Sequence, residues 1–140
     1  MNNVSIRMVR KEFSENEATI DNTYFGKLYE DADGSMVVSY DELDQDTNSI
    51  TRVKIIFNND KFFMDRCGNI SFDVSIKDGR YIYETAMNTP YGDLPVLVES
   101  KSYNIKEYEN NFIIELFYGM IISGERVDDV NLTIFIDRVN

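Results

Sequence analysis

The side chains that most often carry chemistry are scarce in this chain. It has no histidine and a single cysteine, Cys67. Without an imidazole there is no Ser-His-Asp or Cys-His nucleophile and no histidine general base, and one thiolate cannot form a zinc site of four thiolates or of two thiolates and two imidazoles. The charge of the neighbouring Arg66 would favour a reactive thiolate at Cys67. The more common role of such a cysteine is that of a small turn residue.

The acidic stretch from Asp41 to Ser49 invites comparison with a calcium loop. The first, third and fifth positions of an EF-hand pattern are filled by Asp44, Asp46 and Asn48. Ser49 stands where the pattern requires glycine, and Ile55 stands where it requires a bidentate glutamate. We therefore predict a solvated hairpin loop and no metal site.

The composition is that of a folded, acidic protein. Of its 140 residues 43% are hydrophobic and 13% aromatic, which excludes wholesale disorder, and this length predicts one domain over residues 1–140. The formal net charge of −11 opposes binding to nucleic acid or to an anionic membrane. The amino-terminal residues hold no apolar segment of signal-peptide length, and one cysteine agrees with a reducing compartment. We predict a cytoplasmic protein.

Hydrophobic and polar residues alternate through three successive runs between Lys61 and Gly92. One face of each run is formed by Phe62, Met64 and Arg66, then by Ile70, Phe72, Val74 and Ile76, and then by Tyr81, Tyr83, Thr85 and Met87. Alternation with a period of two is typical of half-buried antiparallel strands. This segment therefore determines the class of architecture.

The second and third runs are joined by Asp78-Gly79, a two-residue hairpin signal of type I′. Such a turn places Val74 opposite Tyr83. The same register sets Asp73 opposite Glu84 on the outer face, where solvated carboxylates keep ordinary pKa values and are poor acid–base catalysts. We predict no catalytic residue, no cofactor and a protein that is not an enzyme.

The first and second runs are joined by Cys67, Gly68 and Asn69. A three-residue loop here sets Met64 opposite Phe72, which keeps both apolar sets on one face, whereas a two-residue loop would not. We predict the three-residue loop, with Gly68 or Asn69 in the left-handed conformation.

Six further strands are predicted by composition and by the turn signals between them, at residues 4–10, 19–29, 36–42, 50–57, 96–103 and 130–138. The segment from Phe112 to Ile122 is ambiguous, because its apolar residues fit one face of a helix almost as well. We favour a strand, whose inner face holds Phe112, Ile114, Leu116, Tyr118 and Met120. So many short strands predict an all-β fold, either a closed antiparallel barrel or a sandwich.

Four short motifs follow one another along the chain: Asp65-Arg66-Cys67-Gly68, Met87-Asn88-Thr89-Pro90-Tyr91-Gly92, Ile114-x-Leu116-x-Tyr118 and Asn131-Leu132-Thr133-Ile134. In this order and spacing they resemble the uncharacterised bacterial YwiB-like family, over residues 4 to 138. The resemblance implies a single antiparallel β-barrel of about eight to ten strands, calycin-like or lipocalin-like. It implies no activity, because barrels of this kind host many functions. The family often has a histidine near the position of Tyr83, and this chain has none.

Four residues are candidates for binding a ligand. Arg66, the one charged residue on its apolar face, either closes the barrel mouth by pairing with a carboxylate or receives an anionic head group. Tyr83 and Thr85 bring hydroxyl groups to the inner face, and a buried hydroxyl group needs a partner, which is another side chain, water or a ligand. Tyr91, held between Pro90 and Gly92, either caps one end of the barrel or belongs to an ordinary packed turn.

Two functions fit these features. In the first, the barrel binds a small amphipathic or anionic ligand in a cavity of roughly a few hundred cubic ångströms. In the second, the barrel is an interaction or scaffold protein with a filled core and no ligand. An exposed apolar patch, with Phe63 and Ile82 as candidates, would then bind a protein partner or form a homodimer.

Overall fold

The computed structural model describes residues 2–13 and 18–139, and this part of the chain holds ten β-strands and no helix. The strands are β1 (Asn2–Glu12), β2 (Ala18–Glu30), β3 (Met36–Asp44), β4 (Ser49–Phe57), β5 (Lys61–Cys67), β6 (Phe72–Lys77), β7 (Tyr81–Thr89), β8 (Gly92–Glu107), β9 (Asn111–Ile122) and β10 (Glu125–Arg138). The predicted all-β fold is confirmed, and so is the strand at 112–122. Within the described ranges, no helix could span a membrane.

All ten strands form one antiparallel sheet in the order β6-β5-β4-β3-β2-β1-β10-β9-β8-β7. Each strand pairs with its neighbours in the chain except at β6 and β7, which are the two edges of the sheet. β1 also pairs with β10 and joins the two halves of the sheet. The sheet curls until its two edges, β6 and β7, lie side by side, so that the barrel is nearly closed. This agrees with the calycin-like barrel expected from the resemblance.

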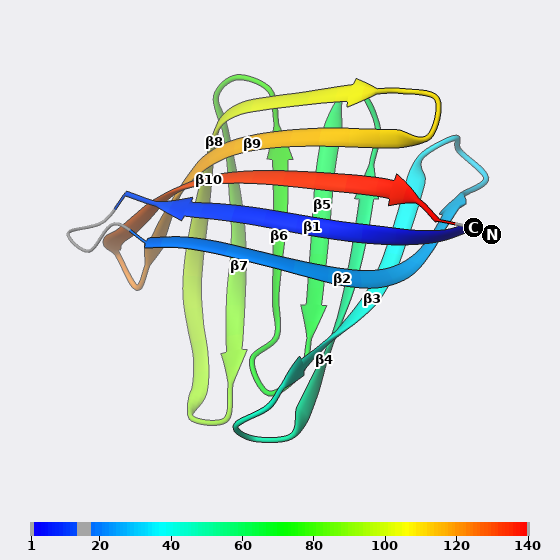
Figure 1. Ribbon diagram of the computed structural model, residues 1–140. Helices are drawn as coiled ribbons and strands as arrows, with labels where there is room; N and C mark the ends of the chain where they lie inside the picture. Colours follow the sequence, from blue (N-terminus) through cyan, green and yellow to red (C-terminus); the bar gives the residue numbers. More distant parts are fainter. Residues whose placement is uncertain (1, 14–17, 140) are drawn as a thin grey trace.

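The barrel is flattened into two layers that cross at a steep angle (Figure 1). One layer consists of β1, β2, β9, β10 and the second half of β8, and the other contains β3 to β7 and the first half of β8. β8 passes from one layer to the other at a bulge between Ser100 and Ser102. β2 pairs with β3 only from Gly26 onward. A Cβ atom at position 26 would clash with the carbonyl oxygen of Ser39, so the two backbones approach closely there. Bulges and close backbone approaches of this kind are how strands turn the corners of a barrel.

The edges of the sheet are held together by a few specific contacts in place of a ladder. Backbone hydrogen bonds join Ser71 and Asn88 in both directions, at 2.9 and 2.8 Å. Farther along the seam, the carboxylate of Asp73 accepts a hydrogen bond of 3.0 Å from the Tyr83 hydroxyl and another from the Thr85 hydroxyl. Side chains thus close the seam where backbone pairing stops.

The predicted type I′ hairpin at Asp78-Gly79 is therefore wrong. Only Gly79 has a positive φ, of 82°, whereas a type I′ turn needs two such residues. The groups next to the turn bond to β8: the Lys77 amide donates to the Ser100 hydroxyl at 3.2 Å, and the Tyr103 amide donates to Asp78 Oδ1 at 3.5 Å. Because β6 and β7 do not form a ladder, the predicted pairing of Asp73 with Glu84 does not occur either.

The loop between β5 and β6 also differs from its prediction. Met64 lies opposite Val74 and Arg66 lies opposite Phe72, so the register is displaced by two residues and the loop spans 68–71. Neither Gly68 nor Asn69 has a positive φ. The displacement preserves which face each side chain occupies, because the side-chain period of a strand is two. The predicted inner positions of Phe62 and Met64 are correct: both side chains are buried.

The β9–β10 turn does have the type I′ geometry. Ser123 and Gly124 have φ values of 53° and 83°, and β10 begins at the next residue. Two positive φ values match the right-handed twist of the flanking strands. The sequence signal at this turn is the same in kind as at Asp78-Gly79, but here the two strands are paired from the turn to Asn111, with one bulge between Arg126 and Asp128.

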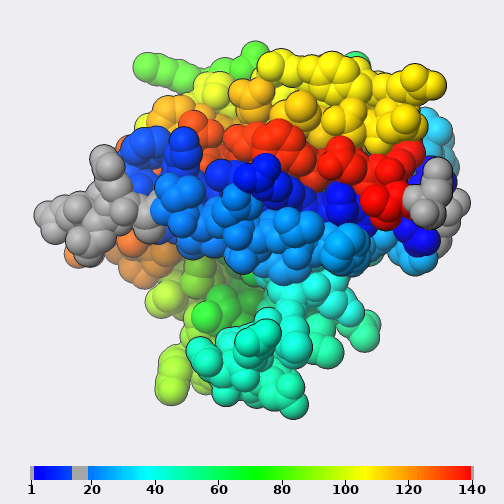
Figure 2. All heavy atoms as spheres, viewed as in Figure 1, coloured from blue at the N-terminus to red at the C-terminus, as the bar shows by residue number. Residues whose placement is uncertain are grey.

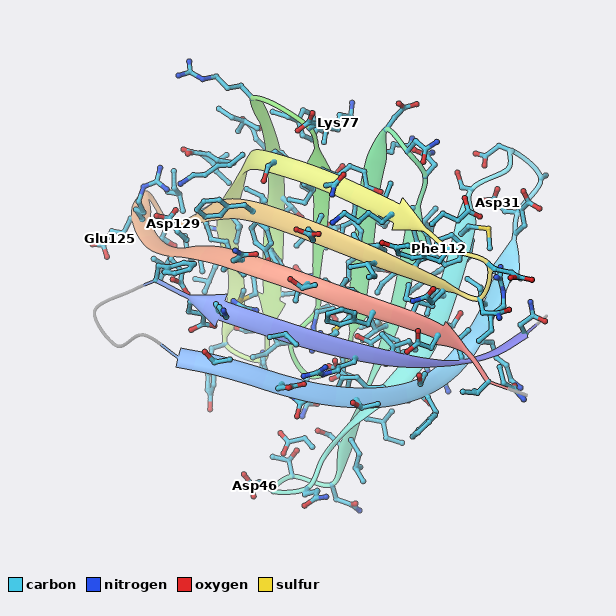
Figure 3. The ribbon with its side chains drawn as sticks, turned by 45° about the horizontal axis from the view of Figure 1, so that its top comes forward. Asp31, Asp46, Lys77, Phe112, Glu125 and Asp129 are labelled. Atoms are coloured by element: carbon cyan, nitrogen blue, oxygen red, sulfur yellow. The ribbon has the colours of Figure 1, made fainter. Side chains whose placement is uncertain are left out.

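Four aromatic side chains of the core, including its three buried phenylalanines, gather at one end of the barrel. Phe57 packs edge-on against Phe112, with ring centroids 5.2 Å apart, and Phe62 lies 6.4 Å from Tyr103. The Tyr103 hydroxyl donates a hydrogen bond to the backbone oxygen of Asn58. In Figure 3, Phe112 marks this filled end, and Asp46 marks the tip of the β3–β4 hairpin at the other. The lumen is therefore filled at one end only.

Candidate functional site

A cavity of about 490 Å³ opens at the end of the barrel opposite the aromatic cluster. It lies between the first half of β2, the β3–β4 hairpin, the β5–β6 loop and β7. The ladder between β2 and β3 stops at Gly26 and Tyr40, so the β3–β4 hairpin diverges from β2 beyond that point. Figure 2 shows this hairpin projecting past the layer that contains β2. The divergence of the two strands creates the mouth.

The floor of the cavity is apolar and rich in methionine. Four of the six methionines of the chain line the cavity, together with Phe72, Val74 and Leu132: Met8, Met64, Met87 and Met120. The more exposed Ile20 and Ile70 also line it. Methionine is unbranched and polarizable, so a methionine surface adapts to apolar groups of varied shape. The floor can therefore accept an apolar body without demanding one shape.

Arg66 lies at the mouth, in an ion pair with Glu42. One guanidinium nitrogen donates to Glu42 Oε2 at 3.2 Å and the other donates to Oε1, which makes the pair bidentate. The Arg66 side chain is 35% exposed and that of Glu42 only 15%. Both side chains line the cavity. Of the two roles considered for Arg66, the structure shows the pairing with a carboxylate.

One of two stacked tyrosines bonds to Glu42. The Tyr40 hydroxyl lies 3.3 Å from Glu42 Oε2 and 3.2 Å from Met8 Sδ. The Tyr24 ring stacks on that of Tyr40 at a centroid distance of 4.9 Å. Burial, and secondly the negative charge of Glu42, raise the pKa of Tyr40 far above its ordinary value. Tyr40 therefore stays protonated and able to donate a hydrogen bond to the carboxylate.

A second arginine, Arg10, lines the cavity on the β1 side. Its Nε lies 2.9 Å from Glu12 Oε1, yet among the described residues this buried nitrogen has no well-aligned hydrogen bond. Tyr118 also lines the cavity, and burial raises the pKa of its phenol although Arg10 and Arg66 act in the opposite direction. The wall thus combines two guanidinium groups with carboxylates and a protonated phenol.

The other three candidate binding residues lie outside the lining of this cavity. Tyr83 and Thr85 donate to Asp73 and close the seam, so their hydroxyl groups find a side-chain partner. Tyr91 is fully exposed at the tip of the β7–β8 hairpin, where its amide donates to Thr89 Oγ1 at 3.1 Å. Of the four, the structure brings only Arg66 to the cavity.

The acidic loop and the cysteine form no recognisable centre. Residues 45–48 make an exposed hairpin tip, in which the Asp46 amide donates to Asp44 Oδ1 at 3.0 Å. Cys67 is exposed at the last residue of β5. In the described part of the chain no group of three or more acidic or cysteine side chains is arranged to hold a metal ion.

Comparison with known proteins adds a family and a fold. Residues 4–134 match the family model described as "Domain of unknown function (DUF1934)". The chain belongs to this family. No curated protein matches the sequence.

A solved structure of the YwiB protein from Bacillus subtilis is similar to this DUF1934 chain over nearly its whole length. The TM-score is 0.85 at 16% sequence identity, and the likeness covers 99% of this chain and 93% of the other. At such low identity the likeness concerns the fold. The resemblance proposed from the four motifs is confirmed.

Sequence reasoning missed most of the site of this DUF1934 protein. Glu42, Arg10 and Tyr118 come from three strands that pair with neither β5 nor β7. Their inner position could be found from the alternation: Glu42 shares a parity with Val38 and Tyr40, and Arg10 with Ile6 and Met8. What alternation cannot give is which of these inner faces meet across the lumen.

Proposed function

We propose that the protein is a non-catalytic, cytoplasmic, lipocalin-like barrel that binds a small amphipathic molecule in the cavity at the β3–β4 end. The observation that carries the proposal is the cavity itself, about 490 Å³ with an apolar floor and a polar mouth. Binding pockets for small molecules typically have a few hundred cubic ångströms of space, apolar walls and a few polar groups that orient the ligand.

The arrangement of the floor and mouth supports an amphipathic ligand. An apolar body would lie on the methionine floor, and each methylene group removed from water contributes about 0.8 kcal/mol. A polar group would remain at the mouth, near the Arg66–Glu42 pair and the hydroxyl groups of Tyr24 and Tyr118. The filled opposite end closes the lumen behind such a ligand, so we propose that it enters and leaves by the β3–β4 end.

The charges at the mouth support binding without catalysis. Arg66 and Arg10 each face a carboxylate, so neither guanidinium group is free to stabilise negative charge that develops in a reaction. The chain also has no histidine to act as a base. The single cysteine and the net charge of −11 support a cytoplasmic protein without a nucleic-acid or membrane partner. A homodimer through Phe63 and Ile82 stays a prediction; Ile82 is 62% exposed.

Two tryptophan substitutions on one strand test the proposal. Met87 of β7 lines the cavity and is only half-buried, so Met87→Trp fills the cavity with little strain on the core. Ile82→Trp places the same side chain on the outer face of β7. The neutral fluorescent probe N-phenyl-1-naphthylamine is expected to bind the parent protein and Ile82→Trp alike, and to bind Met87→Trp about tenfold more weakly, which corresponds to about 1.4 kcal/mol.

Urea unfolding of both variants checks that each is folded. Equal probe affinity in all three proteins would overturn the assignment of the cavity, as would the absence of binding to the parent protein. Native mass spectrometry of protein purified from cell lysate provides an independent readout. A mass excess that disappears on denaturation is expected, and its value gives the mass of the resident ligand.

A further inference from the structure

Both arginines of the cavity wall are already neutralised. Arg66 holds Glu42 through two hydrogen bonds, and Arg10 lies 2.9 Å from Glu12. An anionic head group approaching Arg66 would also approach Glu42, which lines the cavity beside it. The charge of Arg10 is offset by Glu12 next to the cavity wall. The wall therefore offers an anion little net attraction, because the Coulomb energies of the two partners nearly cancel.

Among the charged side chains that line the cavity, Asp44 differs from the others because no described residue forms an ion pair with it. It follows Glu42 by two residues on β3, so both carboxylates lie on the same face of the strand and line the cavity. Asp44 is exposed at the start of the hairpin tip and accepts a hydrogen bond from the Asp46 amide. Among the described residues no cationic group forms an ion pair with Asp44, whereas Arg10, Arg66 and Glu42 are all in pairs.

The surroundings of the mouth carry the same sign of charge. Asp46 lies at the tip of the β3–β4 hairpin (Figure 3), whose Asp44 and Ser49 line the cavity, and the whole chain has a net charge of −11. A field of this sign raises the local concentration of cations and lowers that of anions. Local and long-range electrostatics thus agree.

From the paired arginines, the unpaired carboxylate and the apolar floor we infer that the ligand is a cationic amphiphile, with a protonated amine at Asp44 and an alkyl or aryl body on the methionine floor. The inference rests on the proposed binding function and narrows it: of the amphipathic and anionic ligands considered from the sequence, an anionic head group is the one that this mouth disfavours.

Three probes with one chain length and different head groups test the inference: decylammonium, decan-1-ol and decanoate. Each displaces N-phenyl-1-naphthylamine at neutral pH and low salt, where the amine is protonated, the carboxylate is ionised and screening is weak. Decylammonium is expected to bind most tightly, decan-1-ol less tightly and decanoate most weakly, with about tenfold between the two charged probes.

Two isosteric substitutions separate the local charge from the net charge. Asp44→Asn is expected to weaken decylammonium binding by up to about fivefold, the upper range for an exposed ion pair, and to leave decan-1-ol binding unchanged. Asp41→Asn removes one negative charge from the outer face of the same strand and is expected to leave the affinity for decylammonium nearly as it was.

The outcomes distinguish this inference from the function on which it rests. Tighter binding of decanoate than of decan-1-ol overturns the inference and restores an anion at Arg66. Equal affinity for all three probes also overturns it, while the binding function stands. Failure of decan-1-ol to bind at all overturns the binding function and the inference together.

Discussion

Arg66 and Glu42 form their ion pair across an intervening strand. They lie on β5 and β3, and β4 between them presents Val53 and Thr51, whose small side chains leave room for the guanidinium group to reach the carboxylate. Because the Glu42 side chain is only 15% exposed, removing its partner leaves a partly buried charge without compensation. Removing one partner of such an ion pair destabilises the protein by more than the intact pair stabilises it.

A double-mutant cycle tests the strength of this pair. Arg66→Ala, Glu42→Ala and the double variant are expected to give a coupling free energy of about 1 kcal/mol in urea unfolding, because the arginine is still partly solvated. The control is a surface pair of similar geometry, Arg7 and Asp21, joined at 2.7 Å but 52% and 45% exposed. Its coupling is expected to be no more than about half as large. Equal coupling in the two cycles would contradict a role for burial.

At the scale of the elements, the seam between β6 and β7 is the weakest part of the barrel. A closed barrel has no free edge, but this one replaces a ladder with one backbone bridge and the two hydrogen bonds to Asp73. Burial and the hydrogen bond to Asp73 both raise the pKa of Tyr83, so its hydroxyl remains a donor. The side-chain part of the seam thus depends on one carboxylate.

Asp73→Ala is expected to loosen β6 and β7 without loosening the centre of the sheet. The loss of two hydrogen bonds to a charged, partly exposed acceptor costs about 1–2 kcal/mol. Hydrogen exchange should accelerate in peptides covering 72–77 and 81–89, while β1 and β10 stay protected. Asp65→Ala, which removes the carboxylate paired opposite Asp73 on β5, serves as the control and should leave the seam protected. A uniform change across all strands would contradict the seam's dependence on Asp73.

The limits of sequence reasoning also follow from the strands. Composition and turn signals identified the strands, and a period of two identified the buried face of β5 and of β9, because alternation is a local property of the chain. Pairing is a property of two distant segments, and Asp78-Gly79 shows how a strong local turn signal is overridden when both flanking strands have better partners elsewhere. The same limit applies to the site: parity found Arg66, but its contact with Glu42 depends on the register of β3, β4 and β5.

For the whole molecule, the barrel holds several buried or partly buried tyrosines in protonated form. Five of the nine tyrosines, Tyr24, Tyr40, Tyr83, Tyr103 and Tyr118, have a pKa raised above the ordinary value of 10.0, in each case chiefly by burial. A pKa that is higher in the folded state than in the unfolded state contributes stability that is present in full below pH 10. That stability is lost as the pH rises above this value, because the unfolded chain releases these protons first.

The protein is therefore expected to unfold at alkaline pH, and the ionisation of these five tyrosines is expected to accompany the unfolding. The tyrosinate absorbance of the folded protein should rise at a higher pH than that of the guanidinium-unfolded chain. The two absorbance curves should meet at the pH at which the circular dichroism of the sheet disappears. Tyr118→Phe removes one buried phenol, so the free energy of unfolding should fall less steeply above pH 10 in this variant. Full ionisation of all nine tyrosines while the sheet signal persists would show that the phenols at the mouth and in the core are in contact with water, and a lumen closed at its aromatic end would then be excluded.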